Sequence, residues 1–344
     1  MAFDSSDLQM IFKTASITVT IFSILSISHG QRRSLQPITN INAKISGGDE
    51  ASLYEYTFMA IVVKYDQEKR RSTSEEEKEG RGRLICGGAI IHKDWVLTAS
   101  RCFDGVESYK MFEIFAGIVN LKSEVGQQIR QIEQIAIHPY YNTSSDAFNI
   151  AMVKVSTPFK ITSHVNSGYL PVKPLSISGT ERCHILGFVR EYEEIQGKEI
   201  YEERLIKVQL HAIDYRECAN RLKIIGSHQP YNFSKRNYCL IQIEDYPHNN
   251  SQGACDGDVG GPCVCGFKIQ GIIAHQTNNS CFKPGHPTTI VDVGHHLNWI
   301  RAVILQLNII TKSSAMQISS HARFLLKLFY ILFLLKSLYY IDHL

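Results

Sequence analysis

Apolar residues along this chain gather in short segments that are separated by glycines and polar turn residues. From residue 45 to residue 300 these segments are rich in valine, isoleucine and aromatic residues, and many alternate apolar with polar positions. That combination predicts the strands of an all-β sandwich or barrel. The clearest predicted strands lie within residues 58–65, 84–91, 95–100, 111–118 and 269–275.

One segment near the end of this region has a different period. Residues 295–307 place Leu297, Ile300, Ile304 and Leu307 at the spacing of a single helix face. We therefore expect one helix to follow the strands.

A longer apolar run lies near the amino terminus. Residues 17–27 form an apolar core, and Ser28-His29-Gly30 behind it matches the small-x-small pattern of a signal-peptide cleavage site. We expect residues 1–30 to be a signal peptide, with a buried helix as the alternative for their apolar core. We expect residues 31–44 to be a short pro-segment. Two aspartates offset the one lysine ahead of the core, and translation from Met10 would exclude them.

The chain ends in a tail, residues 308–344, whose hydrophobic part is 322–341. A helix of about 20 residues spans roughly 30 Å. Lys327 and Lys336 lie near its two ends, where their ammonium groups can reach opposite membrane interfaces. We expect a transmembrane anchor. A glycolipid-anchor signal after Ser319-Ser320 and a tail packed on the domain are the alternatives.

Composition narrows the class of protein further. The 344 residues are 44% hydrophobic and carry a net charge of +3, which is too small to favour nucleic acid as a partner. Export would allow the nine cysteines to form disulfides. It would also make glycosylation sites of the sequons at Asn142, Asn232, Asn249 and Asn278.

Three motifs point to one family. Residues 85–102 (ICGGAIIHKDWVLTASRC) frame a strand-turn-strand unit with cysteines, residues 146–155 (DAFNIAMVKV) read as a turn and a strand, and residues 255–265 (CDGDVGGPCVC) form a glycine-rich loop. In this order they closely resemble the trypsin/chymotrypsin family of serine proteases. The resemblance covers residues 45–307. It implies two packed six-stranded antiparallel β-barrels with a C-terminal helix.

The chemistry of that family needs a hydroxyl nucleophile, an imidazole base and a buried carboxylate. By the resemblance, Arg101 stands at the histidine position, Asn149 at the aspartate position and Val259 at the serine position. Valine has no proton to lose, arginine stays protonated, and an amide carries no charge to stabilise an imidazolium. Loss of the nucleophile alone costs on the order of 10⁶ in turnover in subtilisin. We therefore expect an inactive peptidase domain.

Other reactive side chains do not occupy suitable places in the pattern. His92 and His138 lie outside the triad motifs, and Ser100 is adjacent to Arg101 rather than in the glycine-rich loop. The pair His295-His296 lacks metal-ligand spacing. We expect neither a metal nor a cofactor.

The resemblance also implies a disulfide framework. The pairs would be Cys86–Cys102, Cys183–Cys265, Cys218–Cys239 and Cys255–Cys281. Cys263 is left over, and strand alternation places it on the same face as Cys265. We expect a buried free thiol there, with an intermolecular bridge as the alternative.

Two functional fragments of the family survive by the same resemblance. The backbone N–H groups of Gly257 and Val259 occupy the oxyanion-hole positions, which do not depend on the serine side chain. Cleavage between Lys44 and Ile45 would free an amine that pairs with Asp258, because an unpaired buried charge costs roughly 3–5 kcal/mol. We expect this cleavage to switch the loop conformation.

The substrate groove departs from the family. Gly253 stands where trypsin-like members carry the aspartate that selects arginine or lysine, and Ala274-His275-Gln276 replaces the family's Ser-Trp-Gly edge. A glycan on Asn278 would lie near the pocket rim. We therefore do not expect the groove to bind peptides as a protease does.

Two classes of function follow. The first is a secreted or surface-anchored serine protease homologue without catalysis, which binds a protease, a zymogen or an inhibitor and acts as a regulator, cofactor or decoy in an extracellular pathway. The second is a serine endopeptidase with an unorthodox site. The hydrophobic tail also leaves open an adhesive surface protein.

Overall fold

The computed structural model describes residues 40–41, 48–65, 83–106, 108–121, 123–143, 148–178, 181–195, 198–224, 234–242, 253–254, 256–275 and 286–305. For 40–41, 189–195, 198–203, 256 and 275 it describes the backbone alone. All of these residues lie in the compact unit Pro37–Leu344. Both predicted hydrophobic ends, 1–30 and 322–341, lie outside the described residues.

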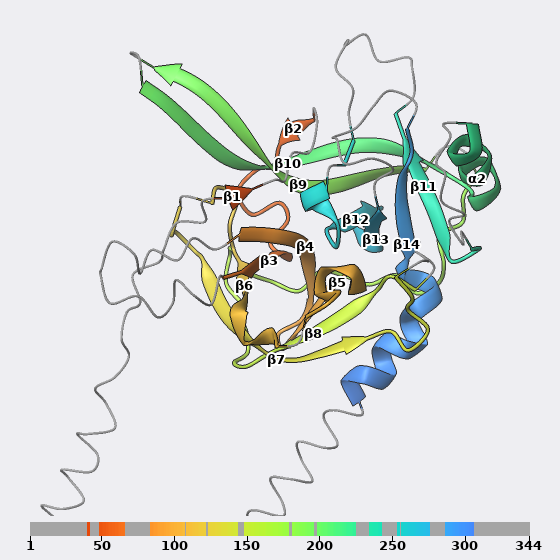
Figure 1. Ribbon diagram of the computed structural model, residues 1–344, viewed down its shortest axis with the longest axis horizontal. Coiled ribbons are helices and arrows are strands. Elements are labelled where there is room, and N and C mark those ends of the chain that lie inside the picture. The colour runs from red at the N-terminus through yellow and green to blue at the C-terminus, as the bar shows by residue number, and fades with distance from the viewer. Residues whose placement is uncertain are drawn as a thin grey trace, which may run out of the picture. The chain divides into compact units, whose positions relative to one another are not determined.

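The first half of the described chain forms a closed barrel (Figure 1). Six antiparallel strands follow one another in the order β4-β3-β6-β7-β8-β5, and the pairing of β4 with β5 closes the ring. β1 (Asn40–Ile41) adds to β4 in parallel. The barrel strands are β3 (Met59–Lys64), β4 (Arg83–His92), β5 (Trp95–Thr98), β6 (Phe112–Ala116), β7 (Gln128–Ile137) and β8 (Ala151–Val155).

The second half repeats the arrangement. The strand order is β11-β14-β13-β12-β9-β10, the pairing of β11 with β10 closes the ring, and β2 (Asp49–Glu50) lines the edge of β10. The prediction of two six-stranded antiparallel barrels is confirmed. The strands are β9 (Arg182–Ile195), β10 (Lys198–Ile213), β11 (Asn237–Ile241), β12 (Pro262–Cys265), β13 (Lys268–His275) and β14 (Thr288–Asp292).

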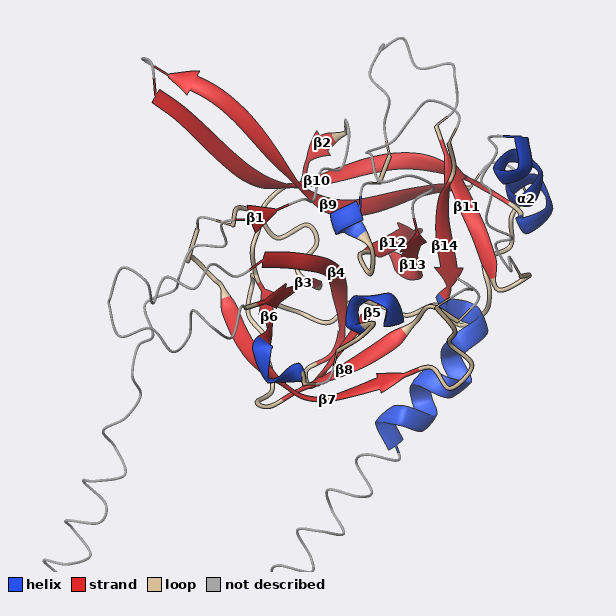
Figure 2. Cartoon of the chain, viewed as in Figure 1, coloured by secondary structure: helices blue, strands red, loops and turns tan. Residues whose placement is uncertain are grey.

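One large apolar core connects the two barrels. It contains Trp95 and Met152 from the first barrel together with Ile272 and Val291 from the second, all fully buried. Inward-facing residues of β-branched and aromatic type fill each barrel, as the alternating sequence pattern requires. The two barrels lie side by side (Figure 2), and this core joins them.

The predicted terminal helix is present. A 3₁₀ turn, η5 (Val293–His296), leads into an α-helix that the structure describes from 297 to 305. The Asp292 side chain accepts a hydrogen bond from the Gly294 N–H at 2.8 Å and so caps the turn. Leu297 and Ile300 are buried, as the helical spacing predicted. No helix in the described part of the chain is long and apolar enough to cross a membrane.

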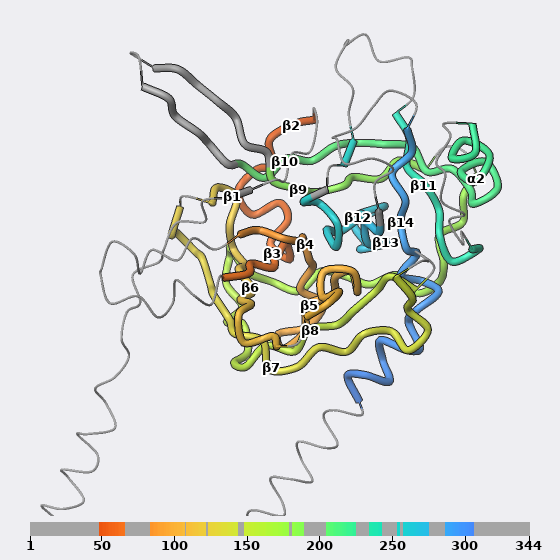
Figure 3. Tube along the Cα trace, in the orientation of Figure 1, coloured from red at the N-terminus to blue at the C-terminus, as the bar shows by residue number. Residues whose placement is uncertain are grey.

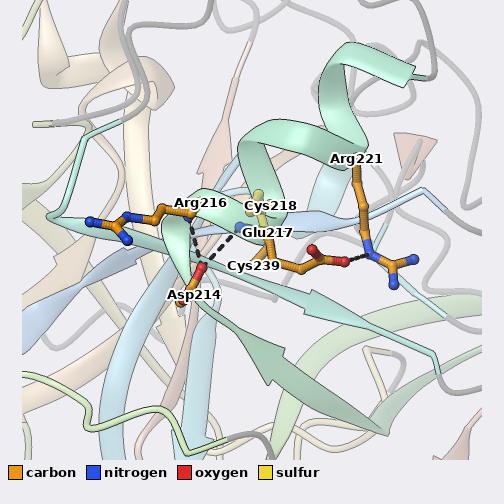
Figure 4. Close-up of polar contacts among 6 residues, drawn as sticks. All are labelled: Asp214, Arg216, Glu217, Cys218, Arg221 and Cys239. Atoms are coloured by element: carbon orange, nitrogen blue, oxygen red, sulfur yellow. Dashed lines mark hydrogen bonds and ion pairs between the residues drawn. A yellow bond between two sulfur atoms is a disulfide. The ribbon is translucent and has the colours of Figure 1, made fainter.

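A second helix, α2 (Tyr215–Ile224), follows β10 and was not predicted (Figure 4). Asp214 accepts hydrogen bonds from the N–H groups of Arg216 and Glu217 at 2.8 and 2.9 Å, which is the geometry of an N-cap. The disulfide Cys218–Cys239 joins α2 to β11.

Strands β9 and β10 continue beyond the barrel as a two-stranded ribbon (Figure 1). Figure 3 traces both strands within the second barrel. Their antiparallel register continues to the pair Ile195 and Lys198. The remaining short elements are 3₁₀ turns: η2 (Ser100–Phe103), η3 (Tyr109–Met111) and η4 (Asp256–Asp258).

Candidate functional site

The segment that carries Arg101 is fixed by its neighbours. It is the 3₁₀ turn η2 after β5, and the disulfide Cys86–Cys102 ties the turn to β4. The Thr98 hydroxyl donates to the Gly87 carbonyl and the Ser100 hydroxyl donates to the Ile150 carbonyl, each at 2.7 Å. Both residues are fully buried, so their hydroxyls bind backbone carbonyls and are not exposed at the surface of the site.

Asn149 lies at the junction of the two barrels, just before β8, and is fully buried. Its Oδ1 accepts a hydrogen bond from the Arg101 backbone N–H at 2.9 Å, and its Nδ2 donates to the Ala274 carbonyl in β13 at 2.8 Å. The amide therefore uses both its acceptor and its donor, as a buried polar group should. A carboxylate in the same place could accept the first bond but could not donate the second.

Arg101 is half-buried, and its guanidinium lies beside a tyrosine. The Tyr141 hydroxyl donates to the Asp104 carboxylate, with oxygens 2.9 and 3.1 Å away. Burial and Asp104 raise the pKa of Tyr141, and the positive charge and hydrogen bonding of Arg101 partly oppose that rise. The cation therefore interacts with this tyrosine–aspartate pair, and it cannot act as a base.

Val259 lies in the loop between η4 and β12, on the other side of the junction. Its carbonyl accepts a hydrogen bond from the Gly87 N–H at 2.9 Å, and the next amide, that of Gly260, donates to the Ile273 carbonyl at 2.8 Å. The side chain is 8% exposed and packs in the core that includes Ala99 and Ala274.

Gly260 allows this close approach between loop and barrel. Its φ of +83° is in the left-handed region, and a Cβ there would collide with the Thr98 hydroxyl and lie 2.6 Å from the Gly87 carbonyl oxygen. The loop thus brings Val259 close to the turn that bears Arg101. The structure brings together the three positions that sequence comparison with the protease family singled out.

Asp258, next to Val259, is 1% exposed and packs against Gly187 in β9. A Cβ at Gly187 would collide with the carboxylate and force the Asp258 side chain to move. The predicted partner segment at Lys44 and Ile45 lies outside the described residues. The cleavage switch stays a prediction.

An aromatic cluster that the sequence did not reveal includes Phe148, the residue before Asn149, and two buried histidines. His138 stacks on Phe148 with ring centres 4.8 Å apart and meets His296 at 5.0 Å and Trp299 at 4.9 Å. The Arg236 guanidinium lies over the Phe148 ring at 5.0 Å. The cluster joins residues before β8 to the start of the terminal helix.

The two imidazoles of this cluster are held neutral. Burial, assisted by the positive charge of Arg236, lowers the pKa of His138 to about 4. Burial also lowers the pKa of His296 to about 3, with further contributions from His138, Arg236 and His295. Neither side chain reaches the surface, since His138 is 6% and His296 2% exposed.

Comparison with known proteins identifies the family. A sequence profile described as Trypsin matches residues 45–300. The chain is a member of the trypsin family. Chymotrypsin-like elastase family member 1 of Homo sapiens is 25% identical over 279 residues, which cover 79% of this chain and 96% of that protein. The snake venom serine protease salmonase of Gloydius brevicauda is 24% identical over 289 residues, 82% of this chain and 93% of the relative.

Solved structures agree on the fold. Neuropsin, a serine protease expressed in the limbic system of mouse brain, superposes with a TM-score of 0.55 at 21% identity. The match covers 77% of this chain and 99% of neuropsin. At this low sequence identity the match supports the trypsin-family architecture and gives no information about activity.

Three of the four disulfides expected from the family are present: Cys86–Cys102, Cys183–Cys265 and Cys218–Cys239. Such bridges accord with the oxidising surroundings of secreted proteins. Cys255 and Cys281 lie outside the described residues. Cys263 is a buried free thiol 3.9 Å from the sulfur of Cys265, and burial raises its pKa to about 12.

The structure describes two further predicted site positions and one of the four sequons. Gly253 is buried, and Gly257 is half-buried in η4. Asn142 is exposed, as a glycosylation site must be. The sequons at Asn232, Asn249 and Asn278 lie outside the described residues.

Proposed function

We propose that this trypsin-family chain does not hydrolyse peptide bonds and acts by binding other proteins, as a regulator, cofactor or decoy in an extracellular protease pathway. One observation carries the proposal. The residues at the three triad positions are an amide, a guanidinium and an alkyl group, and each is integrated into the surrounding structure. Asn149 in particular has both ends of its amide satisfied by Arg101 and Ala274.

The neighbouring reactive groups support the same conclusion. The hydroxyls of Thr98 and Ser100 are buried and donate to backbone carbonyls. His138 and His296 are buried with lowered pKa values, so that neither faces a substrate as a base.

The extracellular setting of the proposal rests on the disulfides together with the predicted signal peptide and sequons. The intact barrels provide a stable surface for a protein partner. A protease, its zymogen or an inhibitor is the proposed partner class. The hydrophobic tail 322–341 would hold a fraction of the molecules at the cell surface.

Hydrolysis of casein and of a mixed peptide library tests the first half of the proposal. The purified chain, before and after cleavage behind Lys44, should hydrolyse no faster than the same chain denatured by heat. Turnover by the native chain that a fluorophosphonate inhibitor abolishes would instead establish a serine endopeptidase.

The regulatory half needs a separate measurement. Adding the chain to the fluid into which it is secreted should change the cleavage of a fluorogenic protease substrate, and heat-denatured chain should not. If cleavage behind Lys44 switches the loop, Asp258→Asn should abolish the difference between the cleaved and uncleaved forms. Equal effects of native and denatured chain would contradict a regulatory role.

A further inference from the structure

A turn on the second barrel exposes an aromatic side chain in an unfavourable conformation. Gly266 and Phe267 form the turn between β12 and β13, with φ of +54° and +64°. Glycine tolerates that region, but a residue with a Cβ pays roughly 1–2 kcal/mol to occupy it. Phe267 is nevertheless 91% exposed, so no packing of its ring compensates for the strain. Strain of this kind is retained where it serves a function more often than elsewhere.

Further exposed apolar residues lie beside the turn. The segment that connects the two barrels runs along β13: Tyr169 forms a β-bridge with Lys268, and the Ile269 N–H donates to the Tyr169 carbonyl at 2.8 Å. A little further on, the Gln270 side chain donates to the Lys173 carbonyl at 3.3 Å. Tyr169 is 77% exposed and Val172, in the same segment, is 75% exposed.

Positive charges surround these apolar groups. Lys173 and Lys268 are exposed members of the two segments just described. Cys183 is paired with Cys265 both in register and by the disulfide, which brings the exposed Arg182 next to Gly266. The acidic neighbour Glu181 accepts hydrogen bonds from the amide and hydroxyl of Ser178. We call this surface the aromatic–basic patch; it comprises Tyr169, Val172, Lys173, Arg182, Phe267 and Lys268.

We propose that the aromatic–basic patch docks the folded domain onto an anionic phospholipid surface. Aromatic rings and aliphatic lysine stems suit the interface between headgroups and acyl chains, while ammonium and guanidinium groups are attracted to anionic lipid. A side chain as exposed as Phe267 at a hairpin tip enters a fluid layer without needing a matching cavity. This favours lipid over a protein partner. The inference does not depend on whether the domain hydrolyses peptides.

A tryptophan introduced at the tip reports on the contact directly. The full chain would carry Phe267→Trp or, as a matched control, Val125→Trp at a 71% exposed position in the turn between β6 and β7. Vesicles would contain phosphatidylcholine with brominated acyl chains, with or without phosphatidylserine. The tail 322–341 is common to all variants, so it cannot produce a difference between them.

Bromine should quench the tryptophan of Phe267→Trp and not that of Val125→Trp, and only when phosphatidylserine is present. Replacing Lys173 and Lys268 by glutamine should raise the lipid concentration for half-maximal quenching, by about fivefold per cation removed. Equal quenching at both positions, or none at the tip while the chain sediments with vesicles, would overturn the proposal. So would shielding of the tip from aqueous acrylamide that grows with protein concentration without vesicles, because a second copy would then be the occupant.

Discussion

At the scale of single residues, the buried amide of Asn149 connects the two barrels. Both ends of its amide are used, one by the Arg101 N–H and one by the Ala274 carbonyl 125 residues away. The sequence identifies the position through family motifs. It does not reveal that the amide donates across the junction of the barrels, because that contact depends on the distant backbone of β13.

The variant Asn149→Asp should therefore destabilise the fold. The new carboxyl group would lose the hydrogen bond to Ala274 and, when ionised, would place a buried negative charge against a carbonyl oxygen. We expect the free energy of unfolding in urea to fall by about 2–4 kcal/mol, with a greater loss at pH 7 than at pH 4. Asn166→Asp, at an exposed position, is the control and should have little effect. An unchanged stability for Asn149→Asp would show that the amide is not required.

Replacement of Phe267, in contrast to that of Asn149, should raise the free energy of unfolding. Phe267→Gly relieves the left-handed strain, removes a ring that is 91% exposed, and adds some disorder to the unfolded chain. The net result should be a gain of about 0.5–1 kcal/mol in the free energy of unfolding. Urea denaturation of the purified variant measures it. A loss of stability would mean that the ring packs on the domain.

At the scale of elements, alternation of apolar and polar residues located the strands well. β3, β4, β5, β6 and β13 begin and end within about two residues of the predicted segments, because their side chains face a core on one side. The ribbon of β9 and β10 was missed because glutamates and lysines outnumber apolar residues there, so no buried face shows in the sequence. α2 was missed because its apolar stripe is short and its fixing disulfide is not a local signal.

The histidine cluster between the start of β8 and the terminal helix predicts a dependence of stability on pH. The pKa of His138 is lowered to about 4 and that of His296 to about 3, whereas both have ordinary values near 6.5 when unfolded. At pH values below 6.5 and above these lowered pKa values, the unfolded chain binds more protons than the folded chain does. Stability is therefore full above pH 6.5 and falls as the pH drops, on the order of 3 kcal/mol at pH 4 for His138 alone.

The variant His296→Phe isolates this effect. It removes one titrating group at a site where the imidazole Nε2 is buried without a hydrogen-bond partner. Urea midpoints measured from pH 7 to pH 4 should decline less steeply than those of the parent chain. His295→Gln, at the exposed neighbour, should keep the parent slope. Identical slopes for all three proteins would mean that the cluster does not couple protonation to folding.

At the scale of the whole molecule, the two barrels meet over one core, and the junction brings Arg101, Asn149 and Val259 together. The fold could be predicted from the sequence because spaced motifs and strand patterns agree over residues 45–300. The aromatic–basic patch could not be predicted, since its members come from segments far apart in sequence. They are united by tertiary contacts such as the pairing of Tyr169 with Lys268 and of Cys183 with Cys265.

The proposal that this protease fold carries no working nucleophile is tested most directly by active-site titration with a fluorophosphonate probe. The full chain, cleaved behind Lys44, should incorporate no more probe than the same chain denatured by heat, while an active trypsin-family protease titrates one probe per molecule. Stoichiometric labelling of the parent chain at a single serine or threonine would contradict the account and identify the residue that replaces the missing serine.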